Sequence, residues 1–288
     1  MDISGTTRVF MILGEPIAQV RAPAVFNHLF RQAGIDAVLV PASVAEADLA
    51  GFVRHALKAR NIDGLWLTIP YKTALYEMLD DCDRLGQAAG AVNAVRRGVD
   101  GRLEGALFDG IGFARSLQGF GFDVAGRRVL LVGAGGAGVA IAASMATAGA
   151  AGIALHDLSP ARTEAVVTRL RRHFDAPLVA AASADPAGFD LVVNCTPLGL
   201  RSDDPMPFDV ARIDHGATVV DILMKSAPTP LLRACAERGI KAHPGFEMLV
   251  QQVPEYLAFF GYDALARQVS ADPSELRTLF QAPGATLV

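Results

Sequence analysis

The chain has 288 residues, 51% of them hydrophobic and 19% charged, and a formal net charge of -4. A chain of this length can form two domains that each bury a core of their own. The net negative charge, and the lack of a Lys/Arg cluster interleaved with aromatic residues, argue against nucleic acid as a partner.

We also expect neither a membrane partner nor a metal. No run of about 18 apolar residues predicts a transmembrane helix, and the first ten residues lack the basic and apolar regions of a signal peptide, so we expect a cytoplasmic protein. Cys82, Cys195 and Cys235 are not in C-x-x-C spacing, which predicts neither a disulfide framework nor a zinc site. The six histidines show no metal-ligand spacing.

The first part of the chain alternates short apolar runs with longer amphipathic segments. This βαβα rhythm favours a sheet with parallel strands covered by helices. The predicted pairs of strand and helix are residues 9–13 with 22–32, 37–40 with 47–59, and 64–68 with 72–79.

A second series of strands begins at Arg128, and its members are RVLLVG, GIALHD, DLVVNCT and ATVVDIL. Between the two series, the polar, glycine-bearing stretch 98–105 predicts a hairpin turn and residues 109–119 predict a joining helix, which places the domain boundary near Leu107. After Ala242 the chain keeps a helical pattern without further strands. We expect that segment to pack back onto the first domain.

A glycine pattern follows the first strand of the second series. Gly133, Gly135 and Gly138 form G-x-G-x-x-G directly before the predicted helix 137–148. In dinucleotide-binding proteins the first glycine makes a tight turn, the second lets the pyrophosphate approach the backbone, and the third brings helix and strand together. The free N–H groups of the helix N-terminus then attract phosphate. The predicted cofactor-binding turn is Gly133, Ala134, Gly135, Gly136, Ala137 and Gly138.

An acidic residue completes this pattern. Asp157 ends the next strand, 19 residues beyond Gly138, where a carboxylate can accept hydrogen bonds from the adenosine ribose hydroxyls. A carboxylate there repels a 2′-phosphate and Leu158 offers no charge to hold one, so we expect NAD in preference to NADP. Arg162 could stack on adenine or neutralise Asp157, which keeps NADP open as the alternative. Asp157 could also be only a helix cap or turn residue.

Seven blocks of the sequence, in the same order, resemble the shikimate/quinate dehydrogenase family. They extend over nearly the whole chain, and together they are far more specific than the glycine pattern alone. The blocks are LGEPIAQVRAP, LTIPYK, GAVNAV, FDGIGF, VGAGGAG, NCTPLG and EMLVQQ.

The resemblance implies an α/β enzyme with two domains. It implies a three-layer α/β substrate-binding and catalytic domain at residues 1–106, a Rossmann-type NAD(P)-binding domain with a doubly wound parallel sheet at 107–242, and C-terminal helices at 243–288 that return to the first domain. Enzymes of this family, which serves aromatic amino acid biosynthesis, interconvert an alcohol and a ketone on a carboxylated six-membered ring by hydride exchange with a nicotinamide.

The family's catalytic pair falls on Lys72 and Asp109. Oxidation of a secondary alcohol needs a group that removes the hydroxyl proton as hydride leaves, and the reverse reaction needs the same group as an acid. A free lysine, with a pKa of about 10.4, is a poor base, but burial can lower that pKa and a carboxylate can orient the amine. Without the surrounding blocks, each would be interpreted as a surface charge.

Other residues match family positions that hold substrate or cofactor. Thr68 and Asn93 match positions that hydrogen-bond ring hydroxyls, and Gln252 matches a C-terminal glutamine that reaches the substrate. The resemblance also assigns cofactor contacts, on the nicotinamide side above all, to Asn194, Thr196, Pro197, Gly199 and Gly245.

The sequence departs from the family in the substrate shell. Val20 and Ala22 stand where two serine hydroxyls typically hold the substrate carboxylate. Each hydrogen bond to a charged group contributes about 1.5 to 3 kcal/mol, so shikimate itself should be a poor substrate. Further polar positions of the family are replaced by Trp66, by Leu107 with Phe108, and by Met224.

We therefore expect a ring substrate with fewer hydroxyls, or one whose carboxylate is displaced toward Arg21, which can bind a carboxylate bidentately. Arg21 could instead be a solvated charge, and Trp66 could be either a stacking wall or a core residue. Two other functions stay open: a genuine shikimate or quinate dehydrogenase, and a relative that binds ligand without turnover. The sequence leaves open the substrate, the direction and the oligomeric state, for which a homodimer is the default.

Overall fold

The computed structural model describes residues 3–18, 20–201, 203–225 and 227–281. The chain divides into two compact units. Unit 1 contains Met1–Phe108 and Val253–Ala285, and unit 2 contains Asp109–Gln252. The chain therefore leaves unit 1 at the start of one helix and returns to it in the middle of another.

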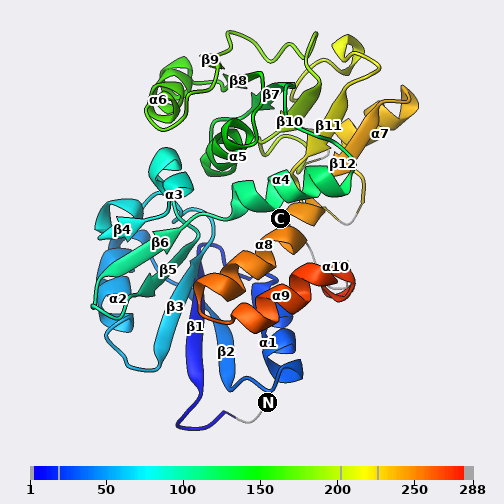
Figure 1. Cartoon of the computed structure of the whole chain (residues 1–288). Helices are drawn as coiled ribbons and strands as arrows, with labels where there is room; N and C mark the ends of the chain where they lie inside the picture. The colour runs from blue at the N-terminus through cyan, green and yellow to red at the C-terminus, as the bar shows by residue number, and fades with distance from the viewer. Residues whose placement is uncertain (1–2, 19, 202, 226, 282–288) are drawn as a thin grey trace. The chain divides into compact units, whose positions relative to one another are not determined.

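Unit 1 is built on a mixed six-stranded sheet in the order β2-β1-β3-β5-β6-β4 (Figure 1). Strand β1 pairs in parallel with β2 and β3, whereas β5 is antiparallel to both β3 and β6. The predicted hairpin is therefore present, with its turn at residues 98–102. The strands are β1 (Arg8–Gly14), β2 (Ala37–Ser43), β3 (Ile62–Leu67), β4 (Asp81–Cys82), β5 (Ala94–Arg97) and β6 (Leu103–Ala106).

Helices cover both faces of this sheet, which makes unit 1 three-layered. Leu13, Leu65 and Leu67 point to the face that packs against α2, because side chains alternate along a strand. Phe10 and Trp66 point to the other face, where α1 and the C-terminal helices lie. These helices are α1 (Ala22–Gln32), α2 (Leu49–Ala56), α3 (Arg84–Ala89), α9 (Asp263–Ala271) and α10 (Ser274–Gln281), joined by the second half of α8 (Phe246–Phe259).

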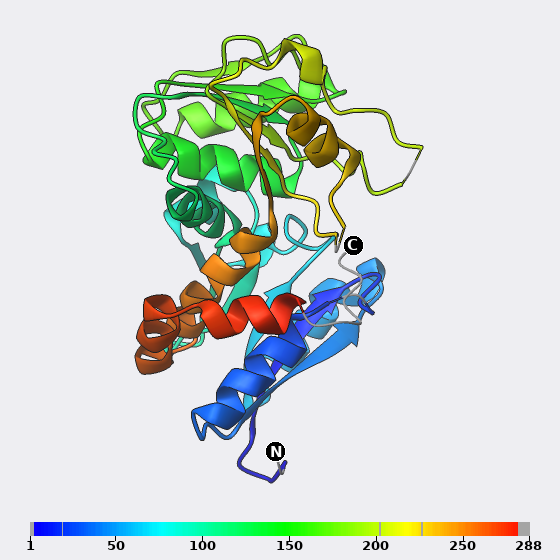
Figure 2. The same cartoon turned by 90° about the vertical axis from the view of Figure 1, so that its right-hand side faces the viewer.

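The C-terminal helices belong to unit 1, as the sequence predicted. Helix α10 (red in Figure 2) lies beside α1, where Glu275 accepts hydrogen bonds from Gln32 and the ring of His28 at 2.7 Å each. On the sheet itself, the indole of Trp66 stacks on the rings of Tyr256 and Phe260, with centroid distances of 5.5 and 4.3 Å. Burial of such large rings is the main attraction between the C-terminal helices and the sheet.

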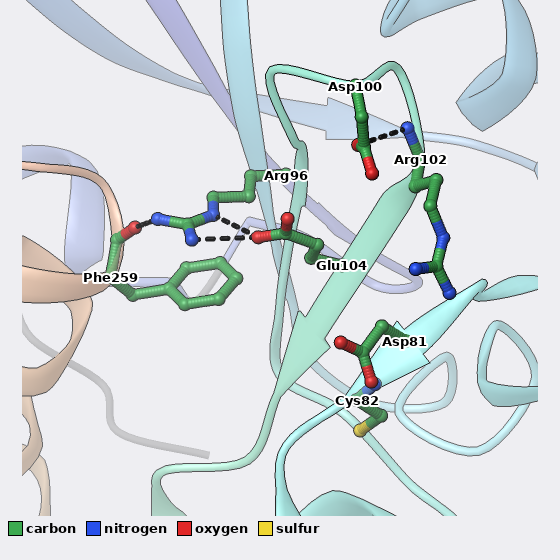
Figure 3. Close-up of polar contacts among 7 residues, drawn as sticks. All are labelled: Asp81, Cys82, Arg96, Asp100, Arg102, Glu104 and Phe259. Atoms are coloured by element: carbon green, nitrogen blue, oxygen red, sulfur yellow. Dashed lines mark hydrogen bonds and ion pairs between the residues drawn. The ribbon is translucent and has the colours of Figure 1, made fainter.

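A polar contact fixes the end of α8 on the hairpin of β5 and β6. Figure 3 shows the guanidinium of Arg96 between the carboxylate of Glu104 and the carbonyl oxygen of Phe259. The Arg96 Nε lies 2.8 Å from Oε2 of Glu104, and the guanidinium carbon lies 4.5 Å from the centre of the Phe259 ring. A cation at the C-terminus of a helix also interacts favourably with the helix dipole.

Unit 2 contains a six-stranded, fully parallel sheet in the order β12-β11-β10-β7-β8-β9. In chain order within the unit this is 6-5-4-1-2-3, the doubly wound Rossmann arrangement. The strands are β7 (Arg128–Val132), β8 (Gly152–His156), β9 (Leu178–Ala180), β10 (Leu191–Asn194), β11 (Thr218–Asp221) and β12 (Lys241–Pro244). The helices are α4 (Asp109–Gly119), α5 (Gly136–Thr147), α6 (Pro160–Arg171), α7 (Pro230–Glu237) and the first half of α8.

The structure differs from the local predictions in one helix and in three strands. Residues 72–79 were expected to be helical, but they form turns and one short 3-10 helix, Tyr76–Met78, because the Lys72 carbonyl accepts its hydrogen bond from Val92 N–H at 2.7 Å. Three strands were not predicted: β4 and β9 have only two and three residues, and β12 lacks a β-branched apolar run and is recognised only by its pairing with β11.

Across the described residues, no helix has the length and apolar character needed to cross a bilayer. Within the same residues, no group of three or more His, Cys, Asp or Glu side chains is placed to hold a metal ion.

Candidate active site

The glycine turn of unit 2 follows β7. From β7 the chain continues to β8 on one side in the sheet, whereas from the neighbouring strand β10 it continues to β11 on the other side. Gly133 follows β7 with φ +110°, a backbone conformation that favours glycine. A Cβ on Gly133 would lie 2.8 Å from the carbonyl carbon of Cys195, in the loop after β10, and a Cβ on Gly138 would overlap the carbonyl oxygen of Gly133. Strands β7 and β10 are neighbours at the switch point of the sheet, where ligands bind in doubly wound folds.

The N-terminus of α5 is open in front of this turn. Gly135 is the N-cap residue, and a Cβ on Gly135 or Gly136 would meet no atom within 4 Å. The first N–H groups of a helix have no partner inside the helix, and they carry the positive end of its dipole. The turn from Gly133 to Gly138 therefore fits the pyrophosphate of a dinucleotide.

Asp157 is attached to the glycine turn itself. Its Oδ2 accepts a hydrogen bond from Ala134 N–H at 2.9 Å, and its Oδ1 accepts one from Ser159 N–H at 3.0 Å. Burial acts to raise the pKa of this carboxyl, but the two N–H groups and the Arg162 charge outweigh it, so the pKa lies below its usual value. Asp157 is therefore ionised at neutral pH.

The neighbours of Asp157 bear on whether Asp157 is only a helix cap and on how Arg162 is placed. The N-cap of α6 is Ser159, whose hydroxyl accepts from Arg162 N–H at 3.4 Å, so Asp157 is not the cap. The guanidinium of Arg162 lies 3.7 Å from Oδ1 of Asp157 and its side chain is 60% exposed, while Leu158 is exposed to solvent.

The loop after β10 is held by the side chain of buried Asn194. Its Oδ1 accepts hydrogen bonds from the N–H and the hydroxyl of Thr196, at 3.0 and 2.6 Å. Thr196 Oγ1 in turn accepts from Leu198 N–H at 3.1 Å, past the exposed Pro197, and Gly199 adopts φ +106°. The loop assigned to the nicotinamide side is thus folded around Asn194.

Gly245 follows β12. A Cβ at this position would overlap the backbone of Ile222, and the Gly245 N–H donates to the Asp221 carbonyl at 2.7 Å. Its lack of a side chain is therefore explained by packing against the segment after β11.

In unit 1, the carboxyl ends of β1 and β3 bring two predicted substrate segments together. Thr68 N–H donates to the Leu13 carbonyl at 3.0 Å, and Glu15 N–H donates to the Ile69 carbonyl at 3.1 Å. The segment that begins at Glu15 continues to the half-buried residues Val20, Arg21 and Ala22. Arg21 precedes α1, and its Nη2 lies 3.5 Å from the carbonyl oxygen of Phe280 in α10.

Asn93 connects the end of β3 to the end of β6. Its carbonyl accepts from Leu67 N–H at 2.8 Å, its N–H donates to the Ala106 carbonyl at 2.9 Å, and its Oδ1 accepts from Phe108 N–H at 3.0 Å. Lys72 is half-buried and lies beside the same segment through its carbonyl bond to Val92. Unit 1 thus gathers Thr68, Lys72 and Asn93 at one edge of its sheet.

Trp66 and Phe108, two of the predicted substrate-binding residues, are buried in unit 1. Trp66 is 2% exposed within the aromatic cluster, which agrees with the core interpretation and not with a stacking wall. Phe108 is 6% exposed and meets Tyr256 edge to face at a centroid distance of 5.0 Å. Both residues shape the core beneath the edge where Thr68 and Asn93 lie.

In unit 2, Asp109 is the buried first residue of α4. Two glycines let neighbouring helices approach α4 closely: a Cβ on Gly110 would overlap the Ala140 carbonyl oxygen of α5, and one on Gly112 would overlap the Met248 carbonyl oxygen of α8. The latter would also lie 3.1 Å from Cβ of the buried Gln252. Asp109, the helix after the glycine turn and Gln252 therefore belong to one packed block.

The segment after β11 carries the half-buried Met224. Its neighbour Lys225 donates from Nζ to the carbonyl oxygens of Gly199 and Leu200, at 3.2 and 2.8 Å. Sequence reasoning missed Asp221, which lies under this segment. The available signal was an acidic residue at the end of the otherwise apolar strand TVVD.

Comparison with known proteins agrees with this geometry. The model of the shikimate dehydrogenase substrate binding domain matches residues 12–95. A shikimate dehydrogenase (NADP(+)) of Geobacter metallireducens is 38% identical over 263 residues, which cover 88% of this chain and 90% of the relative. The chain belongs to the shikimate dehydrogenase family. The resemblance and the fold class predicted from the sequence are thereby confirmed.

Solved structures of the shikimate dehydrogenase fold agree along nearly the whole chain. A quinate dehydrogenase from Corynebacterium glutamicum in complex with NAD has a TM-score of 0.82 and 26% identity, covering 95% of this chain and 98% of its own. A 5-ketofructose reductase of Gluconobacter sp. has a TM-score of 0.79 and 27% identity, covering 93% and 99%. This member of the shikimate dehydrogenase family is an NAD(P)-dependent oxidoreductase that acts on a CH–OH group.

Gly110 offers a test of the packed block. We predict that Gly110→Ala lowers the free energy of unfolding by about 1 to 3 kcal/mol, because the new methyl group forces α4 away from the α5 backbone. The control is Gly119→Ala at the other end of α4, where a Cβ meets nothing within 4 Å, so stability should be unchanged or slightly higher. Urea unfolding measures both variants. Equal stabilities of the two variants would contradict the close packing.

Proposed function

We propose that this shikimate dehydrogenase family member uses NAD to interconvert a secondary alcohol and a ketone on a small cyclic, carboxylated substrate other than shikimate. The observation that carries the proposal is the bond between Asp157 and the glycine turn at the switch point of unit 2. That contact joins the group suited to the adenosine ribose with the turn suited to the pyrophosphate. The edge of unit 1 with Thr68, Lys72 and Asn93 supplies the groups for the substrate.

The preference for NAD rests on charge. The Asp157 carboxylate is held in place by two backbone N–H groups and is ionised at neutral pH, so a 2′-phosphate beside it would be repelled. The guanidinium of Arg162 lies 3.7 Å from Asp157, but its side chain is mostly exposed and its charge is paired with that carboxylate. The NAD complex of the related quinate dehydrogenase supports this choice, whereas the Geobacter relative is named for NADP(+).

Proton transfer falls to Lys72 and Asp109. A nicotinamide held by the loops after β7 and β10 would supply hydride transfer to or from the carbinol carbon. Lys72 would take the hydroxyl proton at Nζ during oxidation and return it during reduction, and Asp109 would orient the amine and share the proton. Asp109 suits this role because it begins a helix that packs against the cofactor-binding helix through Gly110.

Substrate choice follows from predicted substrate-binding side chains that belong to both units. Thr68, Asn93 and Gln252 keep hydrogen-bonding groups for ring hydroxyls, while Val20 and Ala22 cannot donate to a carboxylate. Arg21 is the cation nearest in sequence to those positions, and we propose that it receives the substrate carboxylate with Met224 against an apolar part of the ring. The 5-ketofructose reductase supports the broader point that this fold is used for ketones other than dehydroshikimate.

The second candidate is a genuine shikimate or quinate dehydrogenase. It is favoured by the 38% identity to the Geobacter enzyme over nearly its full length. Shikimate or quinate could be bound and oxidised equally well by the residues that match the family pattern, which are Thr68, Lys72, Asn93 and Asp109. A relative that binds ligand without turnover is the third candidate, and it differs from the first two in showing no hydride transfer with any alcohol.

The cofactor proposal predicts a preference that depends on one carboxylate. The parent protein should show kcat/KM for NAD at least about tenfold above that for NADP, equivalent to about 1.4 kcal/mol. Asp157→Ser should remove most of this ratio, because it removes the charge that repels the 2′-phosphate. Asp175→Ser, at an exposed site of the same unit, should leave the ratio unchanged. A parent enzyme that prefers NADP would refute the proposal.

The catalytic proposal predicts that Lys72→Ala lowers kcat by about 10²- to 10⁴-fold, because the proton acceptor is lost, while NAD affinity stays within about threefold. Lys58→Ala, an exposed lysine of the same unit, should retain parent activity. The assay panel contains shikimate, quinate and cyclic hydroxy acids with fewer hydroxyls. Turnover of shikimate within about tenfold of the best compound would favour the second candidate. A parent that oxidises no compound would favour the third.

A further inference from the structure

The side chain of Asp221, at the end of β11, is completely buried in unit 2. Thr229 donates its hydroxyl to Oδ2 at 2.6 Å, and Oδ1 receives Asn194 Nδ2 at 3.0 Å and Leu223 N–H at 3.3 Å. Burial raises the pKa of this carboxyl, although the three hydrogen bonds act in the opposite direction. Burying a carboxyl group away from water costs free energy unless hydrogen-bond donors surround it. The buried position of Asp221 among three donors therefore points to a role for this side chain.

Asn194 passes the constraint from Asp221 to the loop after β10. While its Nδ2 binds Asp221 and the Leu198 carbonyl, its Oδ1 binds Thr196. The amide is thus fixed in one orientation by partners on both of its ends. A change at Asp221 would free Asn194 to rotate, and the loop from Thr196 to Gly199 would lose its internal support.

The same carboxyl group organises the segment after β11. Thr229, which donates to Asp221, is also the N-cap of α7, where its hydroxyl accepts from Leu232 N–H at 3.3 Å. Between Asp221 and Thr229, Lys225 is bonded to the carbonyls of Gly199 and Leu200. The loop after β10 and the segment after β11 are therefore joined at two places, at the buried Asp221 and at the exposed Lys225.

The position of Asp221 in the sheet separates it from the adenosine end of the cofactor site. Asp157 follows β8, on one side of β7, whereas Asn194 and Asp221 end β10 and β11 on the other side. Three strand spacings lie between β8 and β11, or about 14 Å at about 4.8 Å each. A dinucleotide that crosses the switch point from Asp157 therefore places its nicotinamide half over the loops that Asp221 holds.

We propose that Asp221 is a positioning residue that sets, through Asn194 and Thr229, the two loops that receive the nicotinamide half of the cofactor. This inference rests on the proposed function, because it requires a dinucleotide in the crevice between β7 and β10. Asp221 does not touch the cofactor. It makes the site ready for nicotinamide without contributing to the affinity for the adenosine half.

The test compares two ligands that differ in the nicotinamide. NAD and ADP-ribose share the adenosine and the pyrophosphate, but ADP-ribose lacks the nicotinamide. We expect Asp221→Asn to raise the Kd for NAD by at least about tenfold, since one acceptor oxygen of a buried network becomes a donor, and to leave the Kd for ADP-ribose within about twofold. Isothermal titration calorimetry measures both constants. Asp185→Asn, in an exposed ion pair with Arg212 in the same unit, is the matched control and should change neither.

Thr229 provides a second route if Asp221→Asn does not fold. Thr229→Val removes the hydroxyl that binds Asp221, whereas Thr229→Ser keeps both this hydroxyl and the helix cap. The valine variant should lose affinity for NAD but not for ADP-ribose, and the serine variant should bind NAD like the parent protein. Equal weakening of NAD and ADP-ribose, or no change in either, would overturn the inference. If the parent protein has no measurable affinity for either NAD or ADP-ribose, the proposed function on which the inference rests is refuted instead.

Discussion

The backbone of the turn after β7 lies against the backbone of the loop after β10, at a distance that leaves no room for a side chain on Gly133, and within the turn Gly138 lies equally close to the carbonyl of Gly133. This contact forms the base of the proposed cofactor crevice, because it fixes the N-terminus of α5 beside the loop that begins at Cys195. The groups that define the rest of the crevice are attached to these two segments. Asp157 is bonded to the turn, and Asn194 supports the loop.

The two sides of the crevice are built by different chemistry. On the β8 side, the ionised carboxylate of Asp157 lies where we propose that the ribose binds, and in that proposal it selects against a 2′-phosphate by charge. On the β11 side, a buried carboxyl group is enclosed by donors and acts on the shape of loops. Unit 1 contributes a sheet edge with Thr68, Lys72 and Asn93 and an aromatic core beneath it. We propose that cofactor choice resides in unit 2, and that substrate choice resides in Val20, Arg21 and Ala22 of unit 1 together with Met224 of unit 2.

Most of the fold could be predicted from the sequence, because apolar runs and helical periodicity set strands and helices locally. The helix Ala22–Gln32 and the parallel strands around the glycine turn are examples. Long-range hydrogen bonds account for what was missed. The Lys72 carbonyl binds Val92 instead of continuing a helix, and β12 exists through pairing with β11. In the candidate site, motifs predicted which residues bind ligands, but they did not indicate the buried Asp221, and Trp66 could be assigned to the core only from its contacts with Tyr256 and Phe260.

The central claim is that the turn after β7 and Asp157 together hold NAD. A crystal structure of the protein with NAD tests it most directly. The account predicts the pyrophosphate against the N–H groups at the start of α5 and the adenosine ribose hydroxyls within hydrogen-bond distance of the Asp157 carboxylate. A structure in which the ribose hydroxyls face away from Asp157, or in which the pyrophosphate lies away from α5, would contradict it.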